Sequence, residues 1–407
     1  MKACLEGIRI LDCTIWQVGP VATSMLGDLG ADVIKIEHPE RGDPGRGLEY
    51  ILGAVDIRLP TGGSAYFETI NRNKKSITIN LKHEKGREVL YKLVEKSDVF
   101  VQNMRPGTAE GLGIDYKTLR GINPKIIYAS SFALGSQGEE GKKPGFDANG
   151  QARGGLMFSF AEPGMPPLHG TGGPADQVTG VMLLCGILAA LLARERTGVG
   201  QEVEVSLLAS IMWLLQCHVG IRCLLGEKWE WIQPSRDAAR NPTYNCYKCA
   251  DEKWLMLCMI QSDRWWPDFC KALDHPELEK DARFENSAKR RENSVELVSI
   301  LDGVFATKPR AEWEGILLAG DLLFERIQQV GDLPDDPQVI ANDYIVEAEH
   351  PVLGKSKWLN FPVKLSETPG VIRSPGCEFG QYTEQVLLEL GGYTWDDIVQ
   401  LKEAGAI

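Results

Sequence analysis

The sequence predicts an α/β protein built around a parallel sheet. Residues 7–12 and 32–37 are short apolar runs typical of buried strands, and the helical pattern between them stops at Gly30. A strand, a helix and a strand at this spacing form a βαβ unit, which places both strands parallel in one sheet. The chain of 407 residues is too long for one ordinary core, so we expect more than one domain.

Later segments extend this alternation along the chain. Residues 83–96 carry apolar side chains on one face, as an amphipathic helix does. The other segments read as short strands and helices in turn. We expect strands at 76–81, 98–103, 126–131, 201–206 and 358–363, and helices at 177–196, 207–215 and 383–390.

The middle of the chain differs in composition from its two ends. After Gly226 the sequence becomes rich in tryptophan and mixes strand and helix patterns. The segment 333–337, Leu-Pro-Asp-Asp-Pro, is typical of a linker. We therefore predict a large α/β domain formed by residues 1–225 and 332–407, and a small α+β domain formed by residues 226–331.

Charge and motifs argue against several classes of protein. A net charge of −12 argues against a nucleic-acid partner, which requires a basic face. No G-x-G-x-x-G motif follows the first strand, so a nicotinamide cofactor lacks its main support. Cys246 and Cys249 form a C-x-x-C pair, but no second pair has the spacing that zinc needs. We therefore expect no metal site.

Three features predict a cytoplasmic protein. The first residues lack the apolar core of a signal peptide. The longest apolar run, residues 181–193, is too short to cross a membrane, so we expect no membrane association. Ten cysteines scattered over a long chain are not the disulfide framework of a small secreted domain, and they indicate a reducing compartment.

One aspartate follows a loop rich in Gly and Pro. Asp176 directly precedes the apolar helical segment 177–196. Asp is a common N-cap residue, so one interpretation is structural. The other is a nucleophile, because a carboxylate at the positive end of a helix dipole stays ionised and can attack an acyl carbon. His169, the only histidine nearby, is either an orienting group or a surface residue.

Cations and polar side chains gather at the ends of predicted strands. Residues 103–107 follow the carboxyl end of a strand, which is where α/β sheets bind their ligands. Residues 71–75, which include two lysines, precede another predicted strand. Arg46 lies in an irregular segment before them. Such cations suit phosphate groups, and a solvated turn is the alternative interpretation.

Taken in order, the motifs of this chain resemble those of the class III CoA-transferases, the family of formyl-CoA transferase and the carnitine CoA-transferases. The resemblance covers nearly the whole chain, and its strength comes from the motifs together. They are residues 5–12 (LEGIRILD), Gly19-Pro20, residues 29–37 (LGADVIKIE), 73–76 (NKKS), 98–107 (DVFVQNMRPG), Gly113, Asn123-Pro124, Asp176, residues 197–201 (TGVGQ), Asn241-Pro242, residues 263–265 (DRW) and 336–338 (DPQ).

The resemblance implies an enzyme whose nucleophile is Asp176. It would transfer CoA from a donor acyl-CoA to a carboxylic acid through a mixed anhydride and an aspartyl-CoA thioester. CoA thioesters would be its substrates, and it would need no permanently bound cofactor. The implied CoA-binding residues are Gln17, Asn73, Lys74, Asn103 and Met104, with Arg46 and Arg105 as phosphate partners.

The resemblance also implies an assembly. The large domain would be Rossmann-like, and two chains would thread through each other as an interlocked-ring dimer, formed with a second copy or with a paralogous subunit. The chain is also similar to the succinyl-CoA:benzylsuccinate transferases, which implies succinyl-CoA as donor and an aromatic dicarboxylate as acceptor. It departs from the family at residues 381–383 (QYT), which replace a His-Thr, and it has no match to the glycine loop of formyl-CoA transferase.

Two alternative functions share this fold. An acyl-CoA racemase abstracts an α-proton with a histidine, and that position is Phe146 here, beside Asp147. A non-catalytic subunit that only binds CoA would be expected to lose the acid that this chain retains at Asp176. We therefore predict a CoA-transferase.

Overall fold

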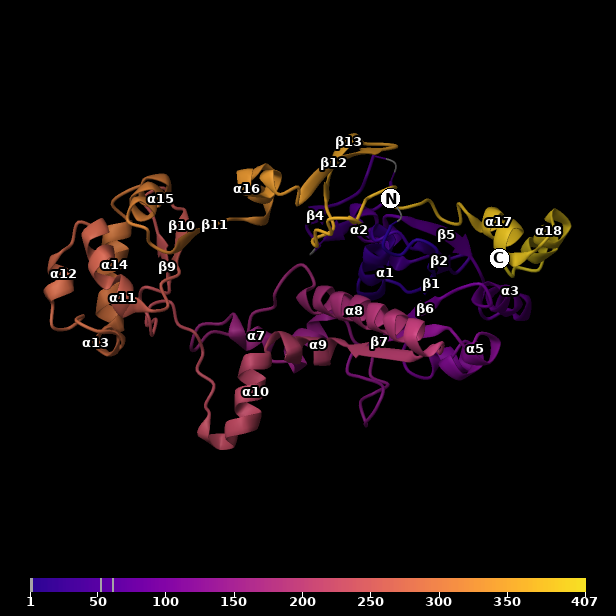
Figure 1. Ribbon diagram of the computed structural model, residues 1–407, viewed down its shortest axis with the longest axis horizontal. Helices are drawn as coiled ribbons and strands as arrows, with labels where there is room; N and C mark the ends of the chain where they lie inside the picture. The colour runs from indigo at the N-terminus through magenta and orange to yellow at the C-terminus, as the bar shows by residue number, and fades with distance from the viewer. Residues whose placement is uncertain (1–2, 52, 61) are drawn as a thin grey trace. The chain divides into compact units, whose positions relative to one another are not determined.

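The computed structural model describes residues 3–51, 53–60 and 62–407 (Figure 1). The chain divides into two compact units, each with its own hydrophobic core. Unit 1 consists of Met1–Met157, His169–Trp229 and Pro337–Ile407, and unit 2 consists of Phe158–Leu168 and Glu230–Asp336.

Unit 1 is built on a six-stranded sheet in which every pair of neighbours is parallel. The strand order is β5-β2-β1-β6-β7-β8, which confirms the predicted α/β class with a parallel sheet. The strands are β1 (Arg9–Cys13), β2 (Asp32–Glu37), β5 (Lys74–Thr78), β6 (Val99–Gln102), β7 (Ile127–Phe132) and β8 (Glu202–Ser206). Two antiparallel hairpins pair β3 (Tyr50–Ile51) with β4 (Val55–Asp56), and β12 (Ile345–His350) with β13 (Gly354–Leu359).

The strand order reverses between β1 and β6. The chain runs outward from β1 to β2 and β5, returns to β6 on the other side of β1, and continues to β7 and β8. Loops at the carboxyl ends of two such strands diverge, and the crevice between them is the usual ligand site of an α/β sheet. The fold therefore predicts a ligand site between the loops that follow Cys13 and Gln102.

Helices cover both faces of this sheet. Successive strand residues point to opposite faces, and here they enter two separate cores. Ile10 and Val99 lie in the core covered by α1 and α8, whereas Leu11 and Phe100 lie in the core covered by α3 and α5. The helices are α1 (Val18–Asp28), α2 (Ala65–Asn71), α3 (Glu84–Val94), α4 (Thr108–Leu112), α5 (Tyr116–Ile122), α6 (Asp147–Arg153), α8 (Pro174–Thr197), α9 (Leu207–Leu214), α10 (Gln216–Leu225), α16 (Pro337–Ala341), α17 (Thr383–Val386) and α18 (Trp395–Glu403), with short 3-10 turns at Pro44–Gly47 and Gly226–Lys228.

Helix α8 is long and apolar enough to cross a membrane, by length and composition alone. It packs against α1, β7 and β8, and it buries Leu183, Ile187 and Ala190 in the core of unit 1. A helix buried in the core of a domain has the same composition, so this packing accounts for the apolar sequence. The segments α9 and α10 pass the same test only as a pair, and they are bent by 83°.

Helix α8 also begins earlier than the predicted residue 177. Its first residue is Pro174, which has a φ suited to a helix and lacks the N–H that would be unpaired there. Gly173, with a φ of +72°, provides the left-handed turn before it. Asp176 is therefore the third residue of the helix and Gly173 is its N-cap, so the interpretation of Asp176 as the N-cap residue is wrong.

The larger differences from the other predicted boundaries are in three elements. Strand β5 begins at Lys74 instead of residue 76, because Lys74 is already paired with Val33 of β2. The charge of this lysine is buried in an ion pair and not solvated in a turn. The predicted strand 358–363 is β13, which starts four residues earlier because Gly354, with a φ of +66°, closes a tight hairpin. The predicted helix 383–390 is α17 followed by a π-helical turn, Leu387–Gly391.

Unit 2 is a small α+β structure, as the fold class predicted. Its antiparallel sheet has the order β11-β10-β9. Trp266 and Trp313 are buried in its core, and Trp313 Nε1 donates a hydrogen bond to the Phe305 carbonyl at 2.9 Å. The elements are β9 (Cys246–Lys248), β10 (Trp254–Leu257), β11 (Phe324–Ile327), α11 (Ser262–Ala272), α12 (Glu277–Lys280), α13 (Ser287–Glu292), α14 (Ser294–Phe305), α15 (Arg310–Ala319) and a 3-10 turn at Val330–Asp335, while α7 (Leu156–Ser159) spans the sequence boundary between the units.

Candidate active site

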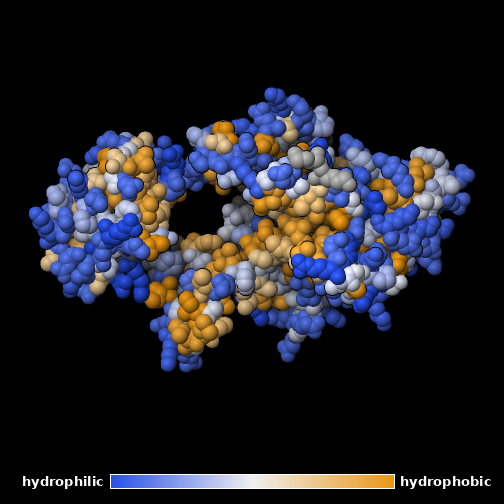
Figure 2. Space-filling view, in the orientation of Figure 1, coloured by the Kyte–Doolittle hydropathy of each residue, from blue (hydrophilic) through white to orange (hydrophobic). Residues whose placement is uncertain are grey.

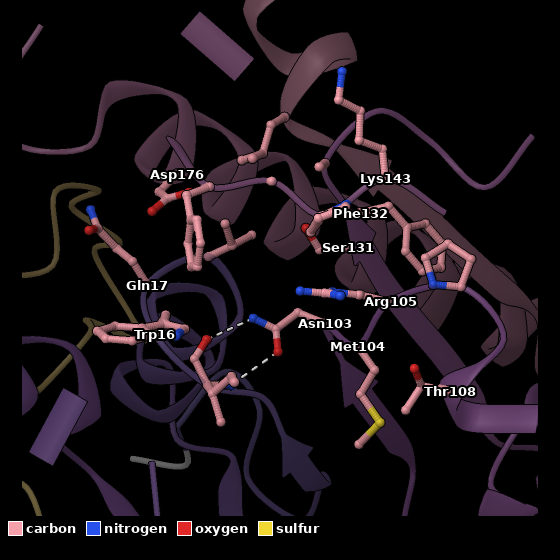
Figure 3. Close-up of a pocket in the computed structure, with 18 residues that line it drawn as sticks. Trp16, Gln17, Asn103, Met104, Arg105, Thr108, Ser131, Phe132, Lys143 and Asp176 are labelled. Atoms are coloured by element: carbon pink, nitrogen blue, oxygen red, sulfur yellow. Dashed lines mark hydrogen bonds between the residues drawn. The ribbon is translucent and has the colours of Figure 1, made fainter. Parts of the chain in front are cut away.

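A cavity of about 470 Å³ opens at the carboxyl ends of β1 and β6, where the strand order reverses (Figure 3). Its volume is in the usual range for small-molecule sites. Five residues predicted for the site line it: Gln17, Asn103, Met104, Arg105 and Asp176. The other lining residues are Ile15, Trp16, Val18, Pro106, Thr108, Ser131, Phe132, Ala133, Lys143, Pro144, Gly145, Phe146 and Leu207.

Asp176 lies in the first turn of α8 and lines this cavity. Burial, and then the charge of Asp147, raise the pKa of its carboxyl from 3.8 to about 7. We expected the helix dipole to keep Asp176 ionised, but with this pKa the carboxyl is only partly ionised near neutral pH. A carboxylate in this position is poorly solvated, which favours its reaction with an acyl carbon once it is ionised.

Asp147, the first residue of α6, makes the contact with the amino end of α8 that we expected of Asp176. Its Oδ1 accepts the backbone N–H groups of Ala175 and Asp176, at 2.7 and 3.1 Å. These two amides belong to the unpaired first turn of α8, so Asp147 caps the helix from outside its own sequence. The positive end of α8 therefore stabilises the charge of Asp147.

A buried glutamine fixes Asp147 and the loop before α8. Gln151 Nε2 donates hydrogen bonds to Asp147 Oδ2 and to the Gly170 carbonyl, the latter at 2.9 Å. Gln151 Oε1 accepts the Gly170 N–H at 2.9 Å. His169 Nε2 lies 3.5 Å from Asp147 Oδ2, and its side chain is 47% exposed. His169 is thus a partner of Asp147.

Gln17 faces the cavity from the loop after β1, on the same side as Asp176 in Figure 3. Its Nε2 donates to the Gly172 carbonyl at 3.3 Å, and the Tyr66 hydroxyl makes a long 3.5 Å contact with its Oε1. Burial, and then the charge of Asp176, raise the pKa of Tyr66, which therefore stays a phenol. A Cβ on Gly173 would lie 2.6 Å from Gln17 Nε2, so only glycine leaves room for this amide.

Asn103 joins the two strand-end loops that form the cavity. Its Nδ2 donates to the Ile15 carbonyl at 2.7 Å, and its Oδ1 accepts the Ile15 N–H at 3.0 Å (Figure 3). Gln102, the residue before Asn103, accepts the Met104 N–H with its Oε1 at 2.6 Å. Its Nε2 donates to Ser130 Oγ at 3.0 Å. The amide of Asn103 therefore holds the wall of the cavity.

A buried ion pair supports the loop that carries Trp16. Trp16 has a φ of +63°, a left-handed conformation that is unfavourable for a bulky residue. Asp43 Oδ1 accepts the N–H groups of Trp16 and Gly45, at 3.2 and 2.9 Å. Its Oδ2 lies 2.8 Å from Lys35 Nζ, which also donates to the Thr14 carbonyl at 2.9 Å. Both charged side chains are fully buried, and their hydrogen bonds to Thr14 and Trp16 fix the backbone of the loop.

The structure does not bring Asn73 to the cavity. This residue precedes β5, at the amino edge of the sheet, whereas the cavity is at the carboxyl edge. Its Nδ2 donates to Asp28 Oδ1 and to the Val371 carbonyl, at 2.8 and 2.9 Å. Its Oδ1 accepts the N–H groups of Arg373 and Ser374, at 2.6 and 3.0 Å. The amide is fully used to fasten the C-terminal segment.

Lys74 and Arg46 are likewise engaged inside unit 1. Lys74 Nζ lies 2.9 Å from Asp12 Oδ2, and both side chains are fully buried. Burial alone would raise the pKa of Asp12, but the charge of Lys74, followed by that of Lys35, lowers it to about 2. Arg46 makes two hydrogen bonds with Glu37, at 2.7 and 2.8 Å. In this structure the two cations serve internal ion pairs, and neither lines the cavity.

The remaining walls are mostly apolar. The rings of Trp16 and Phe146 meet edge to face with their centroids 6.3 Å apart. Arg105 is exposed and points into the cavity in Figure 3. Lys143 points away, and its Nζ lies 3.1 Å from Glu140. Arg105 is thus the lining cation available for an anionic group of a ligand.

Several residues of this site had no predicted role. Asp147 and Gln151 precede Asp176 by more than twenty positions, and Tyr66 lies in a helix of its own. Asp43 looks like an ordinary turn residue in the sequence. One signal was available: buried polar residues in an α/β fold need partners, and Gln151 stands in a segment that leads into two glycines.

The fold and the site together are those of an α/β protein with a small-molecule cavity where the strand order reverses. The chain belongs to CoA-transferase family III, which its residues 5–383 match. It is 32% identical to an (R)-2-hydroxy-4-methylpentanoate CoA-transferase of Clostridioides difficile, over 99% of both chains. It is 31% identical to a cinnamoyl-CoA:phenyllactate CoA-transferase of Clostridium sporogenes, over 98% of this chain and 96% of the other.

Further similarity extends to a human enzyme and to solved structures. The succinyl-CoA:glutarate CoA-transferase of Homo sapiens is 31% identical over 99% of this chain and 90% of its own. The crystal structure of a CAIB/BAIF family protein from Brucella suis matches with a TM-score of 0.84 and 27% identity, over 96% of this chain and all of the other. A Mycobacterium tuberculosis protein matches with a TM-score of 0.80 and 28% identity, over 94% of this chain and 99% of the other. The predicted class III CoA-transferase is thereby confirmed.

Proposed function

We propose that Asp176 is the nucleophile of this CoA-transferase. The observation that carries the proposal is its place in the cavity at the strand-order reversal, poorly solvated and beside the amide of Gln17. A carboxylate can attack a thioester carbonyl without first losing a proton to a base, provided that it is ionised. The pKa of about 7 leaves a large ionised fraction at neutral pH.

The reaction proceeds through four exchanges at acyl carbons. The Asp176 carboxylate attacks the donor thioester, and the CoA thiolate leaves to give a mixed anhydride. The thiolate then attacks the aspartyl carbonyl, releasing the donor acid and forming an aspartyl-CoA thioester. The acceptor carboxylate attacks this thioester and again releases the thiolate. Attack of the thiolate on the acceptor acyl carbon yields the new acyl-CoA and regenerates Asp176, with no net proton transfer.

We assign roles to the residues around Asp176 from their positions in the cavity. The Gln17 Nε2 group is a donor close to the reacting carbonyl, and a small rotation away from Gly172 would direct it to the oxygen that becomes charged. Asn103 and Met104 form the wall along the CoA chain, and Arg105 binds a phosphate of CoA. No permanently bound cofactor takes part.

The walls favour an acceptor with an apolar or aromatic body. Trp16, Phe146, Phe132 and Leu207 present apolar surface to the cavity. Relatives with similar sequences are named for branched and aromatic hydroxy acids, and others are named for succinyl-CoA as donor. We propose succinyl-CoA as donor and an aromatic acid, such as the dicarboxylate benzylsuccinate, as acceptor.

The proposed enzyme works as a dimer in the cytoplasm, in the interlocked-ring arrangement. Helix α10 buries none of its residues within the described chain. Large apolar side chains on it and on α9 are exposed, among them Trp213, Leu224 and Leu225, and Figure 2 shows this apolar surface over α10. An uncovered apolar surface of this kind is typical of a protein interface. A second copy or a paralogous subunit would cover it.

The decisive experiment is to trap the covalent intermediate. The protein is mixed with succinyl-CoA, treated with borohydride or hydroxylamine, and examined by intact mass and peptide mapping. We expect a CoA adduct or its trapped derivative on the peptide that contains Asp176, and none in Asp176→Asn. A panel of carboxylic acids then identifies the acceptor. Absence of any adduct together with α-epimerisation of an acyl-CoA would refute the proposal and favour a racemase.

A further inference from the structure

Unit 2 contains a second cavity, of about 290 Å³, that the proposed reaction does not use. It lies at the amino end of α11 and beside the start of α13. Three arginines line it: Arg240, Arg264 and Arg291. All three are exposed, so their guanidinium groups are accessible to a ligand.

These arginines differ from the others of unit 2. The remaining arginines of the unit form ion pairs with Asp or Glu side chains: Arg236, Arg283, Arg290, Arg310 and Arg326. Arg240, Arg264 and Arg291 form no ion pair with any residue that the structure describes, and all three line the same cavity. The chain has 56 acidic against 44 basic residues, so acidic partners are not scarce. Three like charges around one cavity repel each other unless an anion lies between them.

The carboxylate that lines this cavity does not neutralise the three arginines. Asp263 is ion-paired with Arg290, whose side chain is buried. Arg290 also donates to the Phe284 carbonyl at 2.6 Å and to Ser262 Oγ at 3.1 Å. Asp263 is therefore satisfied from within the unit, and the cavity keeps an excess of positive charge.

The cavity is also built on fixed backbone. Asn241 Nδ2 donates to the carbonyls of Met259 and Ile260, at 3.1 and 3.2 Å, and this holds the loop that precedes α11. The N-cap residue of α11, Gln261, makes no side-chain capping hydrogen bond. Ser262 and Asp263, the first two residues of this helix, line the same cavity as the arginines.

We propose that this cavity binds the phosphate groups of a small molecule. Guanidinium groups bind phosphate through paired, charge-assisted hydrogen bonds, and three of them match a multiply charged group. The volume is at the lower end of the range for ligand sites, so it suits a phosphate or diphosphate group and not a whole coenzyme. The phosphates belong either to CoA itself or to a separate phosphorylated molecule.

Calorimetric titration of the full-length protein with inorganic pyrophosphate tests this site. We expect Arg264→Gln/Arg291→Gln to bind pyrophosphate at least about tenfold more weakly than the unmodified protein. Arg326→Gln is the matched control, because it removes an exposed arginine of the same unit that is paired with Glu314. Arg105→Gln excludes the unit 1 cavity as the source of the signal. Equal affinity in the double variant, an equal loss in Arg326→Gln, or no binding by the unmodified protein would overturn the proposal.

A second measurement identifies where the phosphate comes from. The KM for acyl-CoA and the affinity for adenosine 3′,5′-bisphosphate are determined in the same double variant. A rise in both the KM for acyl-CoA and the dissociation constant of adenosine 3′,5′-bisphosphate assigns the site to the phosphates of CoA. An unchanged KM, with pyrophosphate binding lost, assigns it to a separate phosphorylated ligand. The affinities for pyrophosphate and adenosine 3′,5′-bisphosphate are binding measurements that need no adduct at Asp176, so failure of the proposed nucleophile and failure of this site are distinguishable.

Discussion

Asp147 Oδ1 accepts the backbone N–H group of Asp176 at 3.1 Å, and that of Ala175 at 2.7 Å. Two carboxylates thus share the amino end of α8, and the helix amides stabilise the charge of only one of them. The other, Asp176, is left buried beside a negative charge, which is why its pKa rises to about 7. This arrangement leaves Asp176 as the poorly solvated carboxylate at the amino end of α8.

The rate of adduct formation should therefore depend on pH. Asp176 reacts only when ionised, so the single-turnover rate with succinyl-CoA should rise with pH to half its maximum near pH 7. Asp147→Asn keeps an oxygen acceptor for the amides but removes the charge. We expect the midpoint to move down by about one unit. It should stay above 3.8, because burial, the larger cause of the shift, remains.

The matched control for this prediction is Asp115→Asn. Asp115 caps α5 by accepting the Thr118 N–H at 3.1 Å, so its substitution removes a similar capping charge that does not line the cavity. Its pH midpoint should equal that of the unmodified protein. An unchanged midpoint in Asp147→Asn would mean that the two carboxylates do not interact.

The same pKa shift predicts an effect on stability. The pKa of Asp176 is higher in the folded protein, at about 7, than its usual value of 3.8. The folded state therefore holds this proton more tightly, and the contribution of Asp176 to stability falls as the pH rises from about 4 to about 7. Asp176→Asn cannot ionise, so its melting temperature should exceed that of the unmodified protein by a margin that grows over this range. A margin independent of pH would contradict the shift.

The sequence predicted the sheet well because buried strands leave a local signal. The apolar runs at β1, β2, β6 and β7 were recognisable from their neighbours alone. It failed at Lys74 and Pro174, where a long-range partner or a special backbone position sets the boundary. A lysine that pairs with Asp12, sixty-two positions earlier, cannot be distinguished in the sequence from one in a solvated turn.

The residues of the candidate site also differ in how well the sequence predicts them. Gln17 and Asn103, which the family resemblance implied, and Asp176 lie near the ends of regular elements, at the edge of the sheet where the fold class predicts a ligand site. Asp147 and Gln151 act through contacts with the loop before α8, and these contacts exist only after folding. The sequence thus identified the residues that face the cavity more readily than those that position them.

Lys74→Met distinguishes a structural lysine from a CoA-binding one. Removing one partner of a fully buried pair leaves Asp12 with less compensation, and we expect a loss of about 3–5 kcal/mol in the free energy of unfolding. Lys75→Gln, next to it and partly exposed, should cost no more than about 1 kcal/mol. In both variants, assayed below their melting temperatures, the KM for acyl-CoA should stay unchanged, whereas Arg105→Gln should raise it. A raised KM in Lys74→Met alone would restore the predicted CoA contact.

Phe146 should select for bulky acceptors. Its ring meets Trp16 in the cavity wall, and it is 65% exposed, so truncation should not unfold the protein. We expect Phe146→Ala to lower kcat/KM for aromatic acids about tenfold, by loss of ring contact, and to leave kcat/KM for acetate unchanged. Phe158→Ala, an exposed phenylalanine that does not line the cavity, should change neither. An equal loss for both acids would indicate a general role.

Alanine substitutions of the two glycines at the ends of α8 distinguish the effect of backbone strain from the effect of a contact with Gln17. Gly173 before the helix has a φ of +72° and Gly198 after it has a φ of +73°, so alanine is strained equally at both and should cost about 1 kcal/mol of stability. The alanine Cβ would have open space at residue 198 but would lie 2.6 Å from Gln17 Nε2 at residue 173. We therefore expect Gly173→Ala and Gly198→Ala to lose similar stability, while only Gly173→Ala loses kcat, by about tenfold or more. Equal kcat in the two variants would show that the position of the Gln17 amide does not matter to the reaction.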